Sequence, residues 1–242
     1  MNMDAALEIH DYLPLAYPSA GEGEYIRFVW EAFESNYVAG KYQFSMLAFH
    51  MLYMIYVYFS VWQIKQIKKS DFEHALTFLE EKRRKQLLEA SSPFTLHVVN
   101  ESSVFGFLRL AGCEDQHLGN FKKPVKLRND SAHPNGVITL TDQTATDARI
   151  EEIMQQIRGI QAHMPTVLHA CLLQFLRDSA NPDERQIADS EVHVEINFLH
   201  KHYLSRKDIE ACLACDLSEF NNSPFRGEVQ ALMQVLQTKA EE

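Results

Sequence analysis

The chain has 242 residues, of which 46% are hydrophobic and 23% are charged, a profile that excludes an intrinsically disordered protein and supplies enough apolar side chains for a sizeable core. Its formal net charge of −10 excludes a protein that coats nucleic acid non-specifically, because such a protein needs a broad basic face. Four scattered cysteines, and an N-terminal stretch without the basic start and apolar run of a signal peptide, favour a reducing, cytoplasmic setting.

The first forty residues are predicted to form an irregular lead-in followed by one short helix. Residues 1–20 contain two prolines and are expected to be irregular. Residues 21–38 are aromatic and acidic and are expected to form the helix, which Gly40 ends. We therefore treat residues 1–40 as an N-terminal segment that precedes the main domain.

A long aromatic helix is predicted from about residue 42 to residue 68. Its segment 44–62 is almost continuously apolar and close to the roughly 20 residues that a membrane span needs. The segment also contains His50, two serines and several tyrosines. We favour a central core helix that is buried nearly all round over a membrane span, and we expect no membrane association. His50 is accordingly interpreted as a satisfied core histidine rather than a catalytic helper.

Shorter helices are predicted between residues 70 and 120. Ser70 and Glu73 have the spacing of a capping box at the start of a helix. The charged run 80–85 is interpreted as the solvent-facing side of that helix, which ends at residues 91–93. A further short helix is expected over residues 102–110.

The C-terminal half is predicted to begin with one long helix over residues 142–177. Pro165 is expected to kink this helix. Its apolar residues recur at spacings of three and four, which is the pattern of one buried helix face: Ile150, Ile153, Ile157, Ile160, Met164 and Leu168.

A break at residues 181–183 is interpreted as the boundary of a C-terminal extension that comprises residues 179–242. Hydrophobic residues alternate with polar ones over residues 192–198, which is the pattern of a half-buried strand. Helices are expected to begin near Ser205 and Pro224. The predicted fold class is therefore mainly α, with a helical main domain over residues 41–178 and a small extension of α and β structure.

The residues best suited to chemistry gather in one short segment. Arg128 and His133 are five positions apart, so an irregular helix end, indicated by the Pro134-Asn135-Gly136 sequence, would help to bring them together. Four cations lie within seven positions of an otherwise acidic chain, and a polar residue and a histidine follow them: Lys122, Lys123, Lys126, Arg128, Asn129 and His133.

Such a segment suits the cleavage of RNA. The 2′-hydroxyl of RNA attacks the neighbouring phosphate once it is deprotonated, and His133 suits that proton transfer because the pKa of histidine lies near neutrality. Arg128 suits the charge that develops on the phosphate, because a guanidinium matches phosphate oxygens. Lys122, Lys123 and Lys126 are expected to attract the RNA backbone. Neither chemical step requires a metal or another cofactor, so none is expected.

The segment Arg128-Asn129-Asp130-Ser131-Ala132-His133 resembles the signature of HEPN domains, in which an arginine and a polar residue directly after it precede a histidine at a spacing of four to six residues. The long apolar helices before and after the motif also resemble that family, over roughly residues 41–178. The resemblance implies a HEPN-like helical bundle that dimerises, so that the motifs of two subunits face one cleft. It also implies a metal-independent RNA endonuclease of a toxin–antitoxin, phage-defence or RNA-processing system.

The resemblance further assigns roles to the motif residues. His133 is implied as the general base or acid, Arg128 as the group that holds the scissile phosphate, and Asn129 as the residue that orients one of them. The implied partners are RNA, a second copy of the chain, and an antitoxin or other defence protein. A toxin subgroup has a tyrosine two residues after the histidine, which its antitoxin modifies. Asn135 stands at that position here, which argues against control by that route.

Two other interpretations of the segment stay open. A HEPN-type scaffold could bind RNA or a partner protein without cutting it. The segment could also be a surface helix of an unrelated helical protein, in which Arg128 pairs with carboxylates and His133 lies near the negative pole of the helix end.

A zinc site is a weaker candidate in the C-terminal extension. Cys212 and Cys215 form a CxxC sequence, and His200 and His202 could complete a set of four ligands. The cysteines fall in an amphipathic helix after a good N-terminal cap, where small buried cysteines are ordinary. We therefore expect core cysteines there and no metal.

Overall fold

The computed structural model describes residues 3–132, 136, 138–180, 187 and 189–241. Within these residues the regular structure is helical, and the only β-type contact is an isolated bridge between Pro14 and Ser205. The predicted mainly α-helical class is therefore confirmed.

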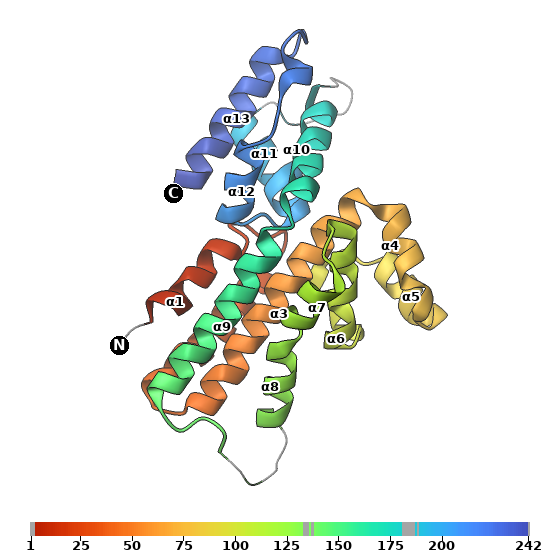
Figure 1. Cartoon of the computed structure of the whole chain (residues 1–242). Helices are drawn as coiled ribbons and strands as arrows, with labels where there is room; N and C mark the ends of the chain where they lie inside the picture. The colour runs from red at the N-terminus through yellow and green to blue at the C-terminus, as the bar shows by residue number, and fades with distance from the viewer. Residues whose placement is uncertain (1–2, 133–135, 137, 181–186, 188, 242) are drawn as a thin grey trace.

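The helices follow one another along the chain, and shorter turns of 3-10 helix connect or extend several of them (Figure 1). In chain order they are α1 (Asp4–Leu7), η1 (Glu8–Tyr12), α2 (Ala20–Val38), α3 (Tyr42–Ile67), α4 (Lys69–Ala75), η2 (Leu76–Phe78), α5 (Glu81–Leu88), η3 (Pro93–Val98), α6 (Glu101–Val104), η4 (Phe105–Ala111), α7 (Asp115–Phe121), α8 (Lys123–Ala132), α9 (Gln143–Gln161), α10 (Pro165–Ala180), α11 (Ser190–Val194), η5 (Glu195–His200), α12 (Arg206–Leu213), η6 (Ser218–Phe220) and α13 (Arg226–Glu241). The segment η5 is a π-helix, and the other η segments are 3-10 helices.

Helix α3 is the centre of the molecule (Figure 1). Every residue from Leu52 to Ile64 is buried, and helices α2, α8, α9 and α10 pack against α3. By length and composition α3 could cross a membrane, and 72% of the apolar window that meets this criterion is buried inside the protein. The expectation of a core helix that is buried nearly all round is confirmed for this stretch.

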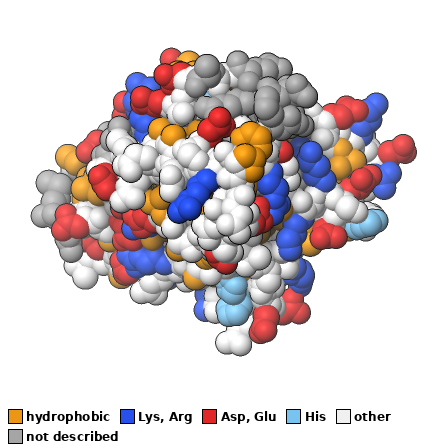
Figure 2. Space-filling view, turned by 90° about the horizontal axis from the view of Figure 1, so that it is seen from above, with side chains coloured by type: hydrophobic (Ala, Val, Ile, Leu, Met, Phe, Trp, Pro, Cys, Tyr) orange, Lys and Arg blue, Asp and Glu red, His pale blue; other side chains and the backbone are white. Residues whose placement is uncertain are grey.

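Charged side chains of both signs are mixed on the surface. Figure 2 shows Lys and Arg interspersed with Asp and Glu over the face seen from above, with scattered hydrophobic side chains between them. The described residues on this face form no broad basic field, which agrees with the formal net charge of −10.

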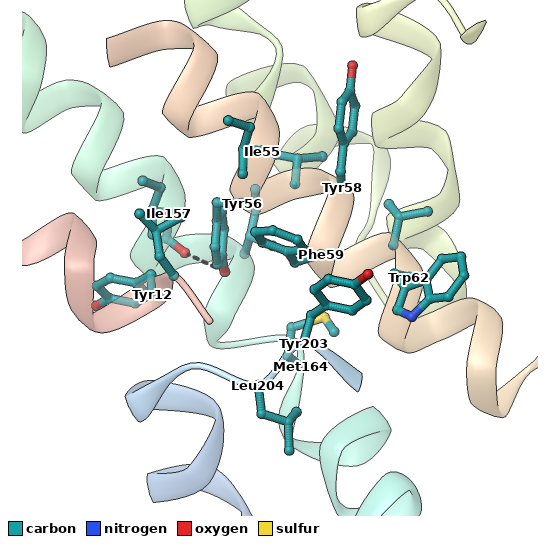
Figure 3. Close-up of a cluster of buried hydrophobic side chains, with 14 of the residues drawn as sticks. Tyr12, Ile55, Tyr56, Tyr58, Phe59, Trp62, Ile157, Met164, Tyr203 and Leu204 are labelled. Atoms are coloured by element: carbon teal, nitrogen blue, oxygen red, sulfur yellow. Dashed lines mark hydrogen bonds between the residues drawn. The ribbon is translucent and has the colours of Figure 1, made fainter. Parts of the chain in front are cut away.

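Aromatic packing holds the end of α3 that lies nearest the C-terminal helices (Figure 3). Phe59 stacks on Tyr203 with the ring centroids 5.2 Å apart, and Trp62 donates its indole N–H to a backbone carbonyl just after η5 at 3.0 Å. The buried Tyr56 hydroxyl donates to the Ile157 carbonyl of α9 at 3.2 Å. Because each ring is buried and its polar end is satisfied, these contacts fix α3 against α9 and the C-terminal helices.

The apolar stripe of the predicted helix over residues 142–177 is buried along its whole length, but the helix is two helices rather than one kinked helix. Helix α9 ends at Gln161 and α10 begins at Pro165. A proline is well accommodated as the first residue of a helix, because the backbone N–H that it lacks would have no partner inside the helix there. Helix α10 then contacts both α3 and the C-terminal helices α12 and α13. The boundary expected at residues 181–183 lies outside the described residues.

The strand expected over residues 192–198 is wrong, because this segment forms helix α11 and η5. Val194 and Phe198 are buried, whereas Val192 and Ile196 are 44% and 45% exposed. The four residues alternate with polar ones, but the two buried residues are also four apart, which is helical spacing. The burial follows the helical period, so the extension contains no strand among its described residues.

The lead-in that was expected to be irregular over residues 1–20 is helical over residues 4–12. Helix α1 and η1 cover residues 4–12, and Ala6 and Ile9 are fully buried. Arg158 of α9 holds η1 in place through an ion pair with Glu8. The two prolines that suggested irregular chain lie after these turns, and the helix expected over residues 21–38 corresponds to α2.

Residues 69–111 form several short helices, as expected, although their bounds differ. The expected helix that starts at Ser70 is divided into α4 with η2 and α5. The helix expected over residues 102–110 corresponds to α6 and η4. Gly112 follows η4 with a φ of 89°, a left-handed conformation that glycine adopts without the steric cost of a side chain.

Candidate active site around Arg128

Helix α8 carries most of the predicted motif. It packs against α3 at the end of the bundle away from the C-terminal helices (Figure 1). Val125 is buried against the core, which directs Lys123 and Lys126 to solvent and leaves Arg128 and Asn129 half-buried. Helix α8 begins at Lys123, so Lys122 lies between α7 and α8. His133, the predicted proton-transfer residue, lies outside the described residues.

Arg128 is joined to two residues that the motif does not contain. Its guanidinium forms an ion pair with Glu101 of α6, and the same carboxylate oxygen lies 3.1 Å from Nε2 of His50 on α3. The side chains of Arg128 and Glu101 are 28% and 29% exposed, whereas that of His50 is 4% exposed. The site is therefore anchored to the central helix through a buried histidine.

The electrostatics of this cluster centre on Glu101. Burial alone would raise the pKa of the Glu101 carboxyl, but hydrogen bonds from His50 and Arg128 outweigh burial and hold the pKa at about 2. Glu101 is also the first residue of α6, where the positive end of the helix favours a carboxylate. The carboxylate is thus ionised throughout the neutral range and keeps the guanidinium in one orientation.

His50 was expected to be a core histidine with both ring nitrogens satisfied, but only one of the two nitrogens has a partner among the described residues. Its Nε2 contacts Glu101, while its Nδ1 is buried and has no hydrogen-bond partner among the described residues. Glu101 itself gave no sequence signal, because its two partners lie 51 and 27 residues away along the chain and no motif links them.

A cavity of about 690 Å³ lies over α8, α9 and the first half of α3; we call it the first cavity. Four cations line it: Lys123, Lys126, Arg128 and Arg149. Arg149 is paired with Glu152 at 2.6 Å and Arg128 with Glu101, whereas Lys123 and Lys126 form no ion pair with another described residue. Lys122 is not among the lining residues. The first cavity is thus a local positive site on an acidic protein.

The chain on both sides of the undescribed residues 133–135 is fixed beside the first cavity. Gln43 of α3 donates to the Ser131 carbonyl at 2.8 Å and accepts from the Thr139 backbone N–H at 2.9 Å. The hydroxyl groups of Ser131 and Thr139 also lie 3.0 Å apart. Ser131 and Thr139 both line the first cavity, so both ends of the segment that contains His133 are held at its edge.

The residues of the suggested zinc site do not come together. Cys212 is fully buried and directs its thiol to the Leu168 carbonyl, and burial raises the pKa of that thiol well above its usual value. His202 is buried, while His200 lies 3.7 Å from Glu195. The described residues contain no group of three or more His, Cys, Asp or Glu side chains placed to hold a metal ion.

Comparison of the chain with models of protein families, with curated proteins and with solved structures found no match.

Proposed function

We propose that the chain is a metal-independent, HEPN-type endoribonuclease that binds RNA in the first cavity. The observation that carries the proposal is the position of Arg128, which lines a cavity together with the unpaired Lys123 and Lys126. Both ends of the segment that contains His133 are anchored at the edge of this cavity through Gln43. The resemblance of residues 128–133 to the HEPN signature supplies the reaction class.

In this proposal the motif residues act on one phosphodiester. His133 takes the proton of the 2′-hydroxyl, the 2′-oxygen forms a bond to phosphorus, and the bond from phosphorus to the 5′-oxygen breaks. A proton returns to the leaving 5′-oxygen, which yields a 2′,3′-cyclic phosphate and a 5′-hydroxyl. Arg128 stabilises the charge on the phosphate oxygens, and Asn129 orients one of these two groups. No step in this sequence requires a metal ion.

The ion pair with Glu101 is compatible with phosphate binding. A guanidinium has five N–H donors in a fixed plane, and Glu101 is bonded at Nη2. The donors on the other edge remain available for phosphate oxygens, so Glu101 acts as a positioning residue for Arg128. We infer that this arrangement reduces the entropy that Arg128 would lose on binding RNA.

The test is to incubate the purified protein with total RNA in the presence of a chelator and to map the new ends. Wild-type protein should produce cyclic phosphate and 5′-hydroxyl ends, and His133→Ala should lower the rate at least about hundredfold, because proton transfer contributes that much. Arg128→Lys should also be strongly impaired, because a point charge does not reproduce a guanidinium fork. Arg177→Lys is the matched control, since Arg177 on α10 pairs with Glu219 of η6, far from the site. Full activity of His133→Ala at an unchanged melting temperature would refute the mechanism.

A second candidate function is a HEPN scaffold that binds RNA or a partner protein without cutting it. The ion pair between Arg128 and Glu101 favours it, because the carboxylate neutralises the charge that the reaction would use. On this alternative, wild-type protein binds RNA but leaves it intact, and Lys123→Ala and Lys126→Ala weaken the binding. Cleavage that disappears in His133→Ala rules the alternative out.

We further propose that the protein works as a dimer in which two first cavities face each other across a two-fold axis. One motif supplies one histidine and one arginine, whereas in-line attack benefits from one group that removes a proton and another that donates one. A self-complementary two-fold contact is the commonest oligomeric interface.

Mixing wild-type subunits with excess His133→Ala subunits should change the activity per wild-type subunit. Strict proportionality, or a monomer by light scattering at working concentration, would contradict a composite site. An antitoxin or defence-system protein is the partner that this proposal implies.

A further inference from the structure

A second cavity adjoins the first one across His50 and Arg128. Its volume is about 480 Å³, and it shares Leu47, His50 and Arg128 with the first cavity. Arg128 therefore has one cavity on each side. The first cavity is rich in cations, whereas aromatic and apolar side chains form most of the lining of the second cavity.

Aromatic side chains from three elements line the second cavity. Tyr25 of α2 and Phe94 of η3 meet edge to face, with ring centroids 5.6 Å apart. Tyr58 of α3 and His97 of η3 complete the aromatic lining. Figure 3 shows the Tyr58 ring pointing away from Phe59 and Tyr203, and Tyr58 itself is buried.

Exposure divides the second cavity into a floor and a mouth. Met54 and Ile55 form a buried floor, while Tyr25 is 40% exposed and His97 is exposed at the mouth. Burial raises the pKa of Tyr58 to about 12, so the Tyr58 hydroxyl stays neutral and can donate or accept a hydrogen bond. The described lining has one carboxylate, Glu101, and it is occupied by His50 and Arg128.

A flat apolar ring with a polar edge is the chemical group that fits such a site. Unpaired bases of RNA bind on aromatic side chains, because every base has a face that stacks. Cavities of roughly 300–1,000 Å³ that are mainly apolar and have a few polar groups are typical of small organic ligands. Arg128 at the border between the cavities would place a phosphate directly beside the ring.

We propose that the second cavity holds the nucleobase adjacent to the phosphate bound at Arg128, so that the site takes single-stranded rather than base-paired RNA. The inference rests on the proposed function in one respect, namely that RNA phosphate binds at Arg128. It adds that affinity comes from a base stacked on Tyr25, with the nearly perpendicular Phe94 ring beside it, as well as from the cations of the first cavity. A paired base cannot enter, because its faces are covered by its neighbours in the helix.

The experiment compares two cleavage-resistant 2′-O-methyl octanucleotides by fluorescence anisotropy, one with bases and one with an abasic backbone. Tyr25→Ala should weaken the base-containing octanucleotide about tenfold, since stacking on one aromatic ring contributes on that scale, and should leave the abasic octanucleotide unchanged. Phe28→Ala is the matched control, because Phe28 lies on the same helix, is 66% exposed and lines neither cavity. His97→Ala is a second variant at an exposed position and should also weaken only the base-containing octanucleotide.

The outcomes separate this inference from the proposed function. If Lys126→Ala weakens both octanucleotides and Tyr25→Ala weakens neither, the base site is refuted while RNA binding in the first cavity stands. If the wild-type protein binds neither octanucleotide, RNA binding at Arg128 is refuted, and the base site is refuted with it. Equal affinity for a duplex and a single strand of the same sequence would also overturn the inference.

Discussion

Replacing Glu101 by glutamine tests the central contact of the site. Glutamine keeps the shape of the side chain and an oxygen that can accept from His50, but it removes the negative charge that faces Arg128. We expect Glu101→Gln to destabilise the protein at neutral pH, because the structure stabilises the charged form of this carboxyl.

The magnitude follows from the pKa of Glu101. A fall from 4.5 to about 2 corresponds to about 3 kcal/mol at neutral pH, at about 1.4 kcal/mol for each pKa unit. The side chain is 29% exposed, so solvent screening lowers the expected value to about 2 kcal/mol. Because the pKa is lowered in the folded protein, this stabilisation is fully present above the unfolded value of 4.5 and is lost as the pH falls towards 2. At pH 3.5 roughly 60% of it should remain.

The assay is equilibrium denaturation of wild-type and variant protein at pH 7 and pH 3.5. The difference in unfolding free energy between the two proteins should shrink as the pH falls. Glu152→Gln is the matched control, because Glu152 pairs with Arg149 at an exposed site and should cost less than about 1 kcal/mol. A difference that is the same at both pH values, or as small as that of Glu152→Gln, would refute the reasoning.

Three further expectations concern the rest of the chain. Burial lowers the pKa of His202 to about 3, so the stability of the folded protein should fall below pH 6.5, where the histidine of the unfolded chain takes up a proton. Between pH 7 and pH 5 the wild-type protein should lose about 2 kcal/mol more unfolding free energy than His202→Leu. Equilibrium denaturation measures this difference, and parallel pH profiles of the two proteins would contradict it. Ser205 accepts from the Asp208 backbone N–H at 3.1 Å in a buried capping box, so Ser205→Ala should cost about 1–2 kcal/mol of unfolding free energy, whereas an unchanged denaturation midpoint would show that the cap is unimportant. Because α3 is buried inside the protein, the chain should purify without detergent, and recovery only from membrane fractions would overturn that expectation.

The sequence predicted those helices whose hydrophobic spacing or capping residues are separated by only three or four positions along the chain. The stripe from Ile150 to Leu168 is buried as the spacing predicted, and Ser205 caps α12 as its sequence indicated. The strand predicted from the alternation over residues 192–198 was wrong because hydrophobic residues at every second position also include pairs four residues apart, which is the spacing of residues on one buried helix face. Tertiary contacts then selected the helix.

The candidate site was predictable only in the part that is continuous in sequence. Arg128 and the lysines form one run, so a motif could find them. Glu101 and His50 come from two other helices, and the contact between them depends on how α3, α6 and α8 pack. The aromatic lining of the second cavity could not be predicted from a continuous motif either, because α2, α3 and η3 each supply part of it.

The Glu101 carboxylate gives the two candidate functions opposite expectations for one variant. If Arg128 takes part in cleavage, Glu101 positions the guanidinium, and Glu101→Gln should lower kcat more than it raises KM because the orientation of Arg128 is lost. If the protein is a scaffold, Glu101 only neutralises Arg128, and Glu101→Gln should bind RNA more tightly, with a steeper dependence on salt because one more cation is free. Glu152→Gln removes the same charge from the wall of the first cavity without freeing Arg128, so it separates a change in net charge from a change at the motif. A variant that cleaves normally and binds normally would show that the ion pair between Glu101 and Arg128 is structural alone.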